Sequence, residues 1–456
     1  MYNADHFQVD LSSLTTYRES CLQLAARQLS SFRSLEEIAA AIDDINVYPR
    51  LDQLSPPQGM ATLDTRHMNK EDLDLARQAI LDGRVLFEHA AAGEATRLKL
   101  EIKFLINLKE SMTLDKLIEF LAFDATVKEI EREIKIAPSE LLHLSLGARH
   151  MLQISFEIFK LAREAGRDPV EVLANQVMLI IVNQASAERI LNEFVAADFF
   201  GFRPQNTLFM IQEAFHGITY DGRQFAFDPD SPALLHNHGQ MVMQETIDDQ
   251  IFYLNPHQEW RPVHLKADQF FDILDRMDDK ISFNIEDLNY LTRALDLPAL
   301  ALALKARDDG YRMVMEVTAN SPEKPQKGGM AAYDRSLHRN VMIESFQLKG
   351  VSDSDIEYLN RNINHYPNPG EVFRKVRAQG LNMPFVVKHG FLYFQPVQGD
   401  INFLVNTLLI TRKEVTPISA WKTPQDTVKA INAMFTQDRQ IGFRAYARAI
   451  LPVWRD

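Results

Sequence analysis

The chain has 456 residues, of which 46% are hydrophobic and 24% charged, as is typical of globular proteins with two or three domains. Its net charge of -13 argues against nucleic acid or an anionic membrane as the main partner, because both require a basic face. The chain contains no run of about 18 apolar residues and does not begin like a signal peptide, so a cytoplasmic location is expected. Cys21 is the single cysteine, which excludes an intramolecular disulfide and a cysteine-based metal site.

The N-terminal part of the chain is predicted to be mainly helical. LEEIAAAIDDI and KEDLDLARQAILDG have helical patterns, whereas paired prolines and a glycine between Tyr48 and His67 predict an irregular stretch. Residues 109–174 repeat apolar side chains at three- and four-residue spacing, in LDKLIEFLAF, VKEIEREIKI and MLQISFEIFKLAREAG. This spacing predicts a block of amphipathic helices.

The pattern changes at Gln176, where strands are expected to alternate with helices. QVMLIIVNQ is a continuous apolar run, typical of a parallel strand that is covered on both faces. A helix, AERILNEFVAADFFGF, is predicted to follow it, and further strands are predicted at TLFMIQ, KISFNI, YRMVMEVT and VMIESFQL. This alternation predicts an α/β sheet whose ligand site lies at the carboxyl ends of the strands.

The segment VLFEHAAAGEATRLK combines a short apolar run with small and then basic residues. Val85–Phe87 is predicted to be the first strand, and AAAGEATR a loop beyond its carboxyl end. Small residues in such a loop let a polyphosphate approach the backbone N–H groups, and Arg97 and Lys103 could supply cations. The alternative is an alanine-rich helix start with solvated basic residues.

Seven short motifs follow one another in an order that resembles the UDP-sugar pyrophosphorylases, particularly the UTP–glucose-1-phosphate uridylyltransferases. They span residues 86–426 and are AAGEATRLK with Lys103, FFGFRPQNTLFMIQ, HNHGQ, NIEDL, the stretch from MEVT to ESFQL, YLNRNINHYPN and ISAWKTPQD. The resemblance implies a GT-A-like α/β nucleotidyltransferase core over residues 81–395, with a helical insertion at about 109–174. Residues 1–80 would form an N-terminal helical region and 396–456 a small C-terminal α/β lobe.

The resemblance also implies an activity, in which UTP and a sugar 1-phosphate, with glucose 1-phosphate the first choice, give a UDP-sugar and pyrophosphate with Mg²⁺. Such a transfer needs positioning and charge neutralisation rather than a covalent nucleophile. The sugar could also be N-acetylglucosamine, galactose or another. The implied catalytic cations are Arg97, Lys103 and Lys422; the nucleotide-binding residues Ala92, Gly93, Gln212, His238 and Gly239; the sugar-binding residues Gly329, Glu344, Asn360 and Asn362; and the metal ligands Glu286 and Asp287.

The chain departs from the family pattern at the phosphate and metal positions. Alanines replace two glycines of the first loop, at Ala92 and Ala95, Gln240 stands at an acidic position, and Glu286-Asp287 replaces an Asp-Asn pair. These changes support a second hypothesis, a nucleotide-sugar-binding protein of the same fold that has weak or no activity. A third hypothesis is a helical scaffold with a vestigial α/β half. The pair Glu286-Asp287 could also be an acidic helix start without metal, and His-x-His at His236 and His238 could bind a transition metal.

Overall fold

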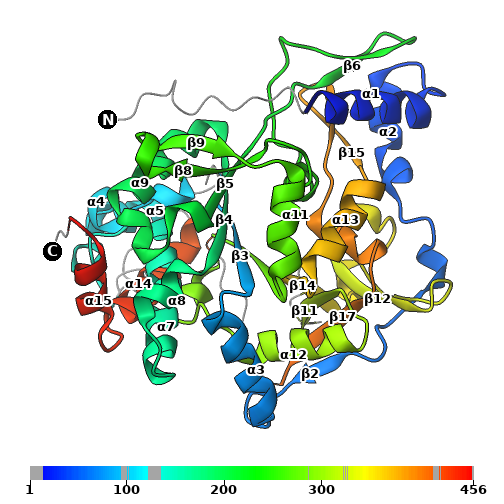
Figure 1. Cartoon of the computed structure of the whole chain (residues 1–456). Helices are drawn as coiled ribbons and strands as arrows, with labels where there is room; N and C mark the ends of the chain where they lie inside the picture. Colours follow the sequence, from blue (N-terminus) through cyan, green and yellow to red (C-terminus); the bar gives the residue numbers. More distant parts are fainter. Residues whose placement is uncertain are drawn as a thin grey trace.

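The computed structural model describes residues 14–93, 100, 102–121, 135–285, 287–321, 323, 325, 327–413, 421 and 423–453. A large mixed sheet runs through the molecule, and helices cover both of its faces (Figure 1). The predicted α/β class is confirmed.

The main path of the sheet joins ten strands. Their order is β2 (Ala61–Leu63), β17 (Thr407–Arg412), β11 (Met313–Ala319), β14 (Tyr358–His365), β10 (Asp279–Asn284), β3 (Val85–Ala90), β4 (Val177–Asn183), β5 (Thr207–Gln212), β8 (Ile251–Asn255) and β9 (Arg261–His264). β14 is antiparallel to both β10 and β11, so those two strands run in the same direction. The carboxyl ends of β2, β17, β11, β10, β3, β4 and β5 therefore lie along one edge.

β4 shows how the sequence pattern becomes a covered strand, because all of its residues are buried. Met178 and Ile180 belong to the hydrophobic cluster that contains α7 (Leu146–Glu164) and α9 (Gln184–Ala196). Leu179 belongs to the opposite cluster, with α10 (His238–Gln244), α11 (Ala267–Arg276) and α13 (Pro369–Gln379). Side chains that alternate along a strand point to opposite faces, so a continuous apolar run fits a strand between two helical layers.

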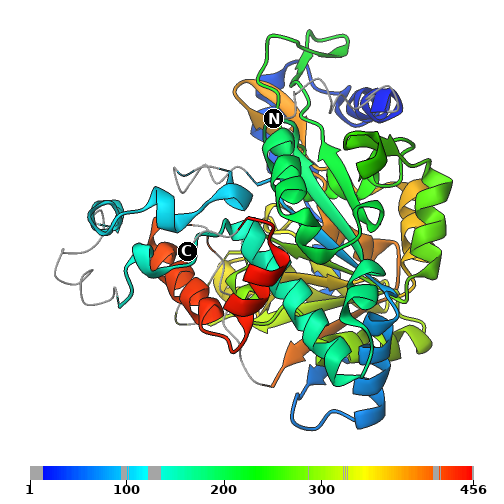
Figure 2. The ribbon, with the colours of Figure 1, turned by 60° about the vertical axis from the view of Figure 1, so that its left-hand side comes forward.

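The remaining elements pack around this sheet. α1 (Thr15–Leu29) and α2 (Leu35–Asn46) pack on a four-stranded sheet of β15 (Phe385–Lys388), β16 (Phe391–Phe394), β6 (Ile218–Tyr220) and β7 (Phe225–Phe227). α3 (Lys70–Leu81) and α12 (Leu297–Asp308) pack together at the opposite end of the molecule (Figures 1 and 2). α8 (Pro169–Ala174), α14 (Thr427–Asp438) and α15 (Phe443–Ile450) join the cluster of α7. The shorter elements include α4 (Leu108–Ser111), α5 (Leu114–Leu121), β1 (Leu54–Ser55), β12 (Met330–Asp334) and β13 (Arg339–Ile343).

Most predicted elements are confirmed, with three corrections. The predicted helix AERILNEFVAADFFGF is α-helical only up to Ala196 and continues as a 3-10 turn, Asp198–Gly201. The stretch from Tyr48 to His67 contains β1 and β2, and β2 pairs with β17 at the edge of the large sheet, so this stretch is not wholly irregular. The predicted strand VMIESFQL is strand only up to Ile343 and continues as a 3-10 turn. Most of VKEIEREIKI lies outside the described residues.

The predicted domain boundaries at residues 80 and 395 stay predictions. β2 lies before the first boundary and β17 after the second, and both strands belong to the large sheet. Within the part of the chain that the structure describes, no helix is both long and apolar enough to cross a membrane.

Candidate nucleotide and sugar site

The first loop begins where β3 ends, as predicted. β3 runs from Val85 to Ala90 between β10 and β4, and the residues up to Gly93 are not helical. Asn183, at the end of β4, donates from Nδ2 to the Ala92 carbonyl at 2.7 Å. Its Oδ1 accepts the backbone N–H of Ser186 at 2.8 Å and so caps α9. Asn183 thus ties the predicted phosphate loop to the neighbouring strand, a role that the sequence did not indicate.

The structure brings Gly93 close to Lys103, two of the residues assigned to the phosphates. A Cβ atom placed on Gly93 would lie 4.0 Å from Cδ of Lys103. Lys103 begins a 3-10 turn and is buried. Arg97, Lys422 and the loop residues 94–99 lie outside the described residues.

At the end of β5, the predicted base-binding residues meet. Gln212 is buried and donates from Nε2 to the Asn237 carbonyl at 2.9 Å and to Oε1 of Gln240 at 3.2 Å. Gly239 donates its backbone N–H to the Pro396 carbonyl at 3.0 Å. A Cβ atom there would lie only 2.5 Å from N of Val397, so this contact requires glycine.

His238 connects α10 to the segment that follows β16. Its Nδ1 accepts the backbone N–H of Gln398 at 2.9 Å, which places the proton of a neutral ring on Nε2. Nδ1 of His236, in turn, lies 3.2 Å from Oη of Tyr17. Both histidines thus have partners within the protein, and their spacing in the sequence is explained by packing.

A buried ionic cluster lies beneath this segment. Lys280 is fully buried, with its Nζ 2.5 Å from Oε2 of Glu88 and paired also with Glu245. Gln398 donates from Nε2 to Oγ of Ser282 at 2.9 Å, and Ser282 bonds Glu88. Burial and the charge of Glu88 raise the pKa of Glu245 well above its usual value. Lys280 therefore lies between two buried carboxylates and pairs with both.

Three of the four predicted sugar-binding residues come together: Gly329 directly before β12, Glu344 directly after β13, and Asn360 in β14. The backbone N–H of Asn360 donates to the Gly329 carbonyl at 3.0 Å. A Cβ atom on Gly329 would lie 2.6 Å from Sδ of Met342, so a side chain there would crowd Met342, and it would lie 3.4 Å from Oε1 of Glu344, at contact distance. Burial raises the pKa of Glu344. Asn362 belongs to β14, and its side chain is outside the described residues.

The segment 396–400 lies between the base and sugar groups, and the sequence analysis did not select it. Pro396 contacts Gly239, Gln398 bonds His238, and a Cβ atom on Gly399 would lie 3.9 Å from Oε1 of Glu344. Next to it, burial and the charge of Glu344 raise the pKa of the buried Asp400 carboxyl well above its usual value. The signal that could have identified this segment is the run QPVQGD directly after an aromatic strand.

Asp287, one of the two predicted metal ligands, caps a short 3-10 turn, Leu288–Leu291. Its Oδ1 accepts the backbone N–H of Asn289 at 2.9 Å, and burial raises its pKa. It lines a cavity of about 80 Å³ together with Arg361 and Arg412. Glu286 lies outside the described residues.

The two arginines of this cavity are paired with carboxylates. Arg412 donates from Nε to Oε1 of Glu316 at 2.7 Å and from Nη2 to Oδ2 of Asp296 at 2.6 Å. Arg361 also pairs with Glu316. The sequence analysis did not select these arginines, although Arg412 is the last residue of the largely apolar strand β17. A phosphate group that entered this cavity would compete with the Glu316 carboxylate for the two arginines.

The four groups of residues follow one edge of the sheet. Asn183 and Gln212 are cross-strand partners on β4 and β5. The backbone N–H of Ile285 donates to the Ala90 carbonyl at 3.3 Å, which brings the turn before Asp287 next to the first loop. Loops at the carboxyl ends of parallel strands are the usual place for ligands in α/β sheets.

Solved structures of UDP-sugar pyrophosphorylases resemble this fold. A UDP-N-acetylglucosamine pyrophosphorylase from Trypanosoma brucei aligns with a TM-score of 0.56 and 12% identity, over 98% of this chain and 87% of that one. A point mutant of UDP-glucose pyrophosphorylase from Leishmania major, in complex with UDP-glucose, gives 0.55 and 12%, over 94% and 79%. A putative UDP-N-acetylglucosamine pyrophosphorylase from Entamoeba histolytica gives 0.51 and 12%, over 82% and 86%.

No protein-family model and no curated protein sequence matches the chain. At 12% identity the likeness is one of fold. For the fold, it confirms the resemblance to UDP-sugar pyrophosphorylases that the seven motifs predicted. The neighbours themselves act on two different sugars.

Proposed function

We propose that this protein is a uridylyltransferase that forms a UDP-sugar and pyrophosphate from UTP and a sugar 1-phosphate, glucose 1-phosphate in the first instance. The observation that carries the proposal is the position of segment 396–400. It joins Gly239 and His238 on one side to Glu344 on the other, at the edge where a nucleotide sugar would lie. A nucleotide sugar needs these two recognition sites side by side.

Each group of residues has a role in this reaction. Gln212 and the Gly239 backbone would hold uracil, because an amide offers a donor and an acceptor to its edge. The N–H groups of Ala92 and Gly93, with Lys103, would bind the phosphates of UTP. Glu344 and Asn360 would bind sugar hydroxyls.

Arg97 and Lys422 would add positive charge while the sugar phosphate oxygen attacks the α-phosphorus of UTP and pyrophosphate leaves. No covalent enzyme intermediate is required, because the acceptor oxygen is already on the sugar phosphate. The protein's contribution is therefore to hold the attacking oxygen in line and to neutralise the phosphates.

The direct test is pyrophosphate release from UTP, Mg²⁺ and glucose 1-phosphate, with N-acetylglucosamine 1-phosphate in a parallel reaction. Release above the rate without sugar phosphate is the expected result. Thermal stabilisation by UDP-glucose without any release would instead support the binding-protein alternative. No release and no stabilisation by UTP or either UDP-sugar would reject both.

One observation favours that second candidate. Gln240 occupies a position where the resembled family has an acidic residue, and its amide is used inside the protein. Its Oε1 accepts the backbone N–H of His236 at 2.8 Å, and its Nε2 donates to the Glu213 carbonyl at 2.7 Å. A side chain held in this way supports the loop and is not available as a ligand for a metal.

We also propose that Mg²⁺ binds between the UTP phosphates and Glu286, with Asp287 in a supporting role. Mg²⁺ commonly uses one or two carboxylates plus substrate phosphates, and among the described residues no group of three or more His, Cys, Asp or Glu could hold a metal alone. When bound, Mg²⁺ would neutralise charge on the phosphates. The N-cap contact of Asp287 makes Glu286 the preferred ligand.

Glu286→Gln should therefore shift the Mg²⁺ dependence of UTP turnover to higher concentration, by about tenfold for the loss of one carboxylate ligand. Asp287→Asn should shift it less, because its amide oxygen can still cap the turn. A Mg²⁺ titration of pyrophosphate release measures both. Unchanged Mg²⁺ dependence in the two variants, or a parent that needs no metal, would leave the pair as an acidic turn only.

A further inference from the structure

The N-terminal helix α1 holds both loops that form the predicted base site. Arg18 pairs with Glu213, the residue directly after Gln212, and its Cζ lies 5.5 Å from the centre of the Phe215 ring. Oη of Tyr17 lies 3.2 Å from Nδ1 of His236, and its ring is 5.1 Å from that of Phe215. Two consecutive residues of α1 thus contact the segment after β5 and the segment before α10.

These contacts continue directly to the residues assigned to uracil. The backbone N–H of His236 donates to Oε1 of Gln240 at 2.8 Å, and the same oxygen accepts from Nε2 of Gln212 at 3.2 Å. Between them Asn237 has a φ of 71°, a left-handed conformation that costs free energy in a residue other than glycine. The loop therefore needs its neighbours to hold it in place.

Arg18 compensates the charge of a buried carboxylate, that of Glu213. The Glu213 side chain is 3% exposed, and Arg18 is the cation paired with it. Burial raises the pKa of Glu213, and the charge of Arg18 opposes that shift. Without Arg18, the carboxylate would have to take up a proton or turn toward water. Either change would disturb the Glu213 carbonyl, which accepts from Gln240 at 2.7 Å.

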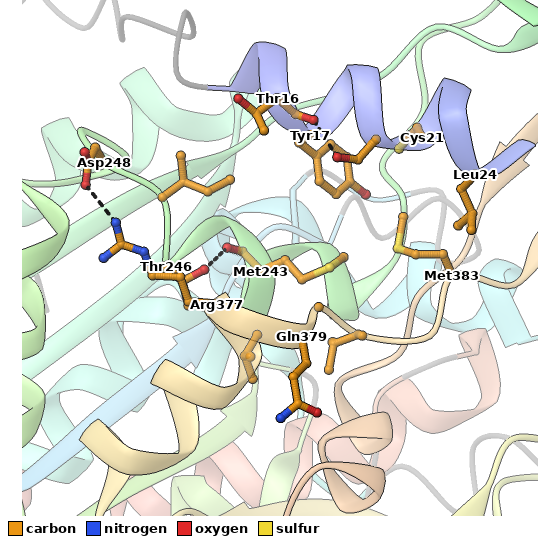
Figure 3. Close-up of a pocket in the computed structure, with 15 residues that line it drawn as sticks. Thr16, Tyr17, Cys21, Leu24, Met243, Thr246, Asp248, Arg377, Gln379 and Met383 are labelled. Atoms are coloured by element: carbon orange, nitrogen blue, oxygen red, sulfur yellow. Dashed lines mark hydrogen bonds and ion pairs between the residues drawn. The ribbon is translucent and has the colours of Figure 1, made fainter.

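A cavity lies next to these contacts, and Tyr17 lines it as well. Figure 3 shows Tyr17, Cys21 and Leu24 of α1 above Met243 and Met383, with a cavity between them. The cavity is about 640 Å³ and lies between α1 and the ends of α10 and α13. Farther along α1, Cys21, Ala25 and Leu29 are buried in the cluster with the small sheet. The polar contacts of Tyr17 and Arg18 fix the first turns of the helix over the loops.

We propose that α1 is part of the nucleotide site, with Tyr17 and Arg18 as positioning residues that hold the base-recognition loops after β5 and before α10. This inference rests on the proposed function, because it assumes that Gln212 and Gly239 bind uracil. It adds a role for a helix that precedes the nucleotidyltransferase core in the sequence. Arg18 and Tyr17 do not need to touch the nucleotide for this role.

The test is the affinity for UTP, measured by calorimetry with Mg²⁺, in Arg18→Met and in Arg27→Met. Arg27 is exposed on the same helix, so its variant makes the same change of charge and is the matched control. Arg18→Met should weaken UTP binding by about fivefold, the loss expected when a buried hydrogen bond at a site is weakened. The preference for UTP over ATP should fall with it, whereas Arg27→Met should match the parent.

Two conservative variants separate positioning from folding. Arg18→Lys keeps the charge beside Glu213 and should restore most of the UTP affinity. Tyr17→Phe keeps the ring contact with Phe215 and removes only Oη, so it should weaken UTP binding by about two- to threefold with little change in melting temperature. A purely structural role would lower the melting temperature and leave the preference for UTP over ATP unchanged.

The results separate the positioning role of α1 from the proposed function. If the parent binds UTP and the Arg18→Met and Arg27→Met variants bind it equally well, the positioning role is wrong and the proposed function stands. If the parent binds neither UTP nor UDP-glucose, the proposed function fails, and the role of α1 fails with it. Should Arg18→Met not fold, Tyr17→Phe gives the same decision, since unchanged UTP affinity in that variant would reject the positioning role.

Discussion

Replacing Lys280 with methionine is expected to lower the free energy of unfolding by about 3–5 kcal/mol, the usual cost of breaking a buried ion pair from one side. Lys280 and Glu88 are both fully buried, and their charged atoms lie 2.5 Å apart. Methionine has a similar length but no charge, so Glu88 would remain as a carboxylate without its cation or would have to take up a proton. Chemical denaturation of parent and variant measures the difference.

Two matched variants make this prediction specific. Burial and the neighbouring Glu88 raise the pKa of Glu245, and Glu245→Gln keeps an oxygen acceptor for Lys280 and leaves its ion pair with Glu88 in place, so this variant should cost only about 1 kcal/mol. Lys305 has a side chain that is 67% exposed, and Lys305→Met should stay within about 0.5 kcal/mol of the parent. A Lys280→Met variant as stable as Lys305→Met would contradict the ion pair.

The second large effect is expected from Gly239→Ala. The added Cβ atom would lie 2.5 Å from N of Val397, and backbone cannot yield as a side chain can. Either α10 or segment 396–400 must move, which would break the contact of Gly239 N–H with the Pro396 carbonyl. We expect affinity for UDP-glucose to fall at least about tenfold, equivalent to about 1.4 kcal/mol, together with a stability loss of about 1–3 kcal/mol.

Gly83→Ala is the control, because it crowds backbone before the start of β3, at the opposite end of that strand from the first loop. Its Cβ atom would lie 2.9 Å from the carbonyl carbon of Asn175. It should lower stability by a similar amount while leaving UDP-glucose affinity near that of the parent. Equal affinity in the two variants, measured by calorimetry below their melting temperatures, would argue against Gly239 as a nucleotide-binding residue.

The strands that carry the site were predictable because their patterns are local. β4 is an unbroken apolar run, and β3 and β5 combine short apolar stretches with polar residues at their carboxyl ends. Each pattern reflects burial between two helical layers. It can therefore be recognised in the sequence without knowing which strands are neighbours. The same locality explains why the resemblance located Gln212 and Gly239 in short motifs.

Other parts of the site could not be predicted, because they depend on residues far apart in the chain. Gln398 reaches Ser282 and His238, and Arg18 reaches Glu213, across separations of 116, 160 and 195 residues. The periodicity and spacing of residues in the sequence do not indicate such long-range contacts. The short β2 was also missed, because its three residues are too few for a pattern and its place is set by pairing with β17.

The sequence by itself determined which segments become buried strands and helices, and it placed small, basic and amide residues where those strands end. Apolar periodicity has this power because burial depends on the residue and its immediate neighbours. Only the tertiary structure decided that β14 enters between β10 and β11, that Lys280 lies between Glu88 and Glu245, and that α1 holds the loops beside Gln212. These features arise from strand pairing and charge compensation between segments that are distant in the sequence. Such contacts stabilise the protein only after folding has brought those segments together.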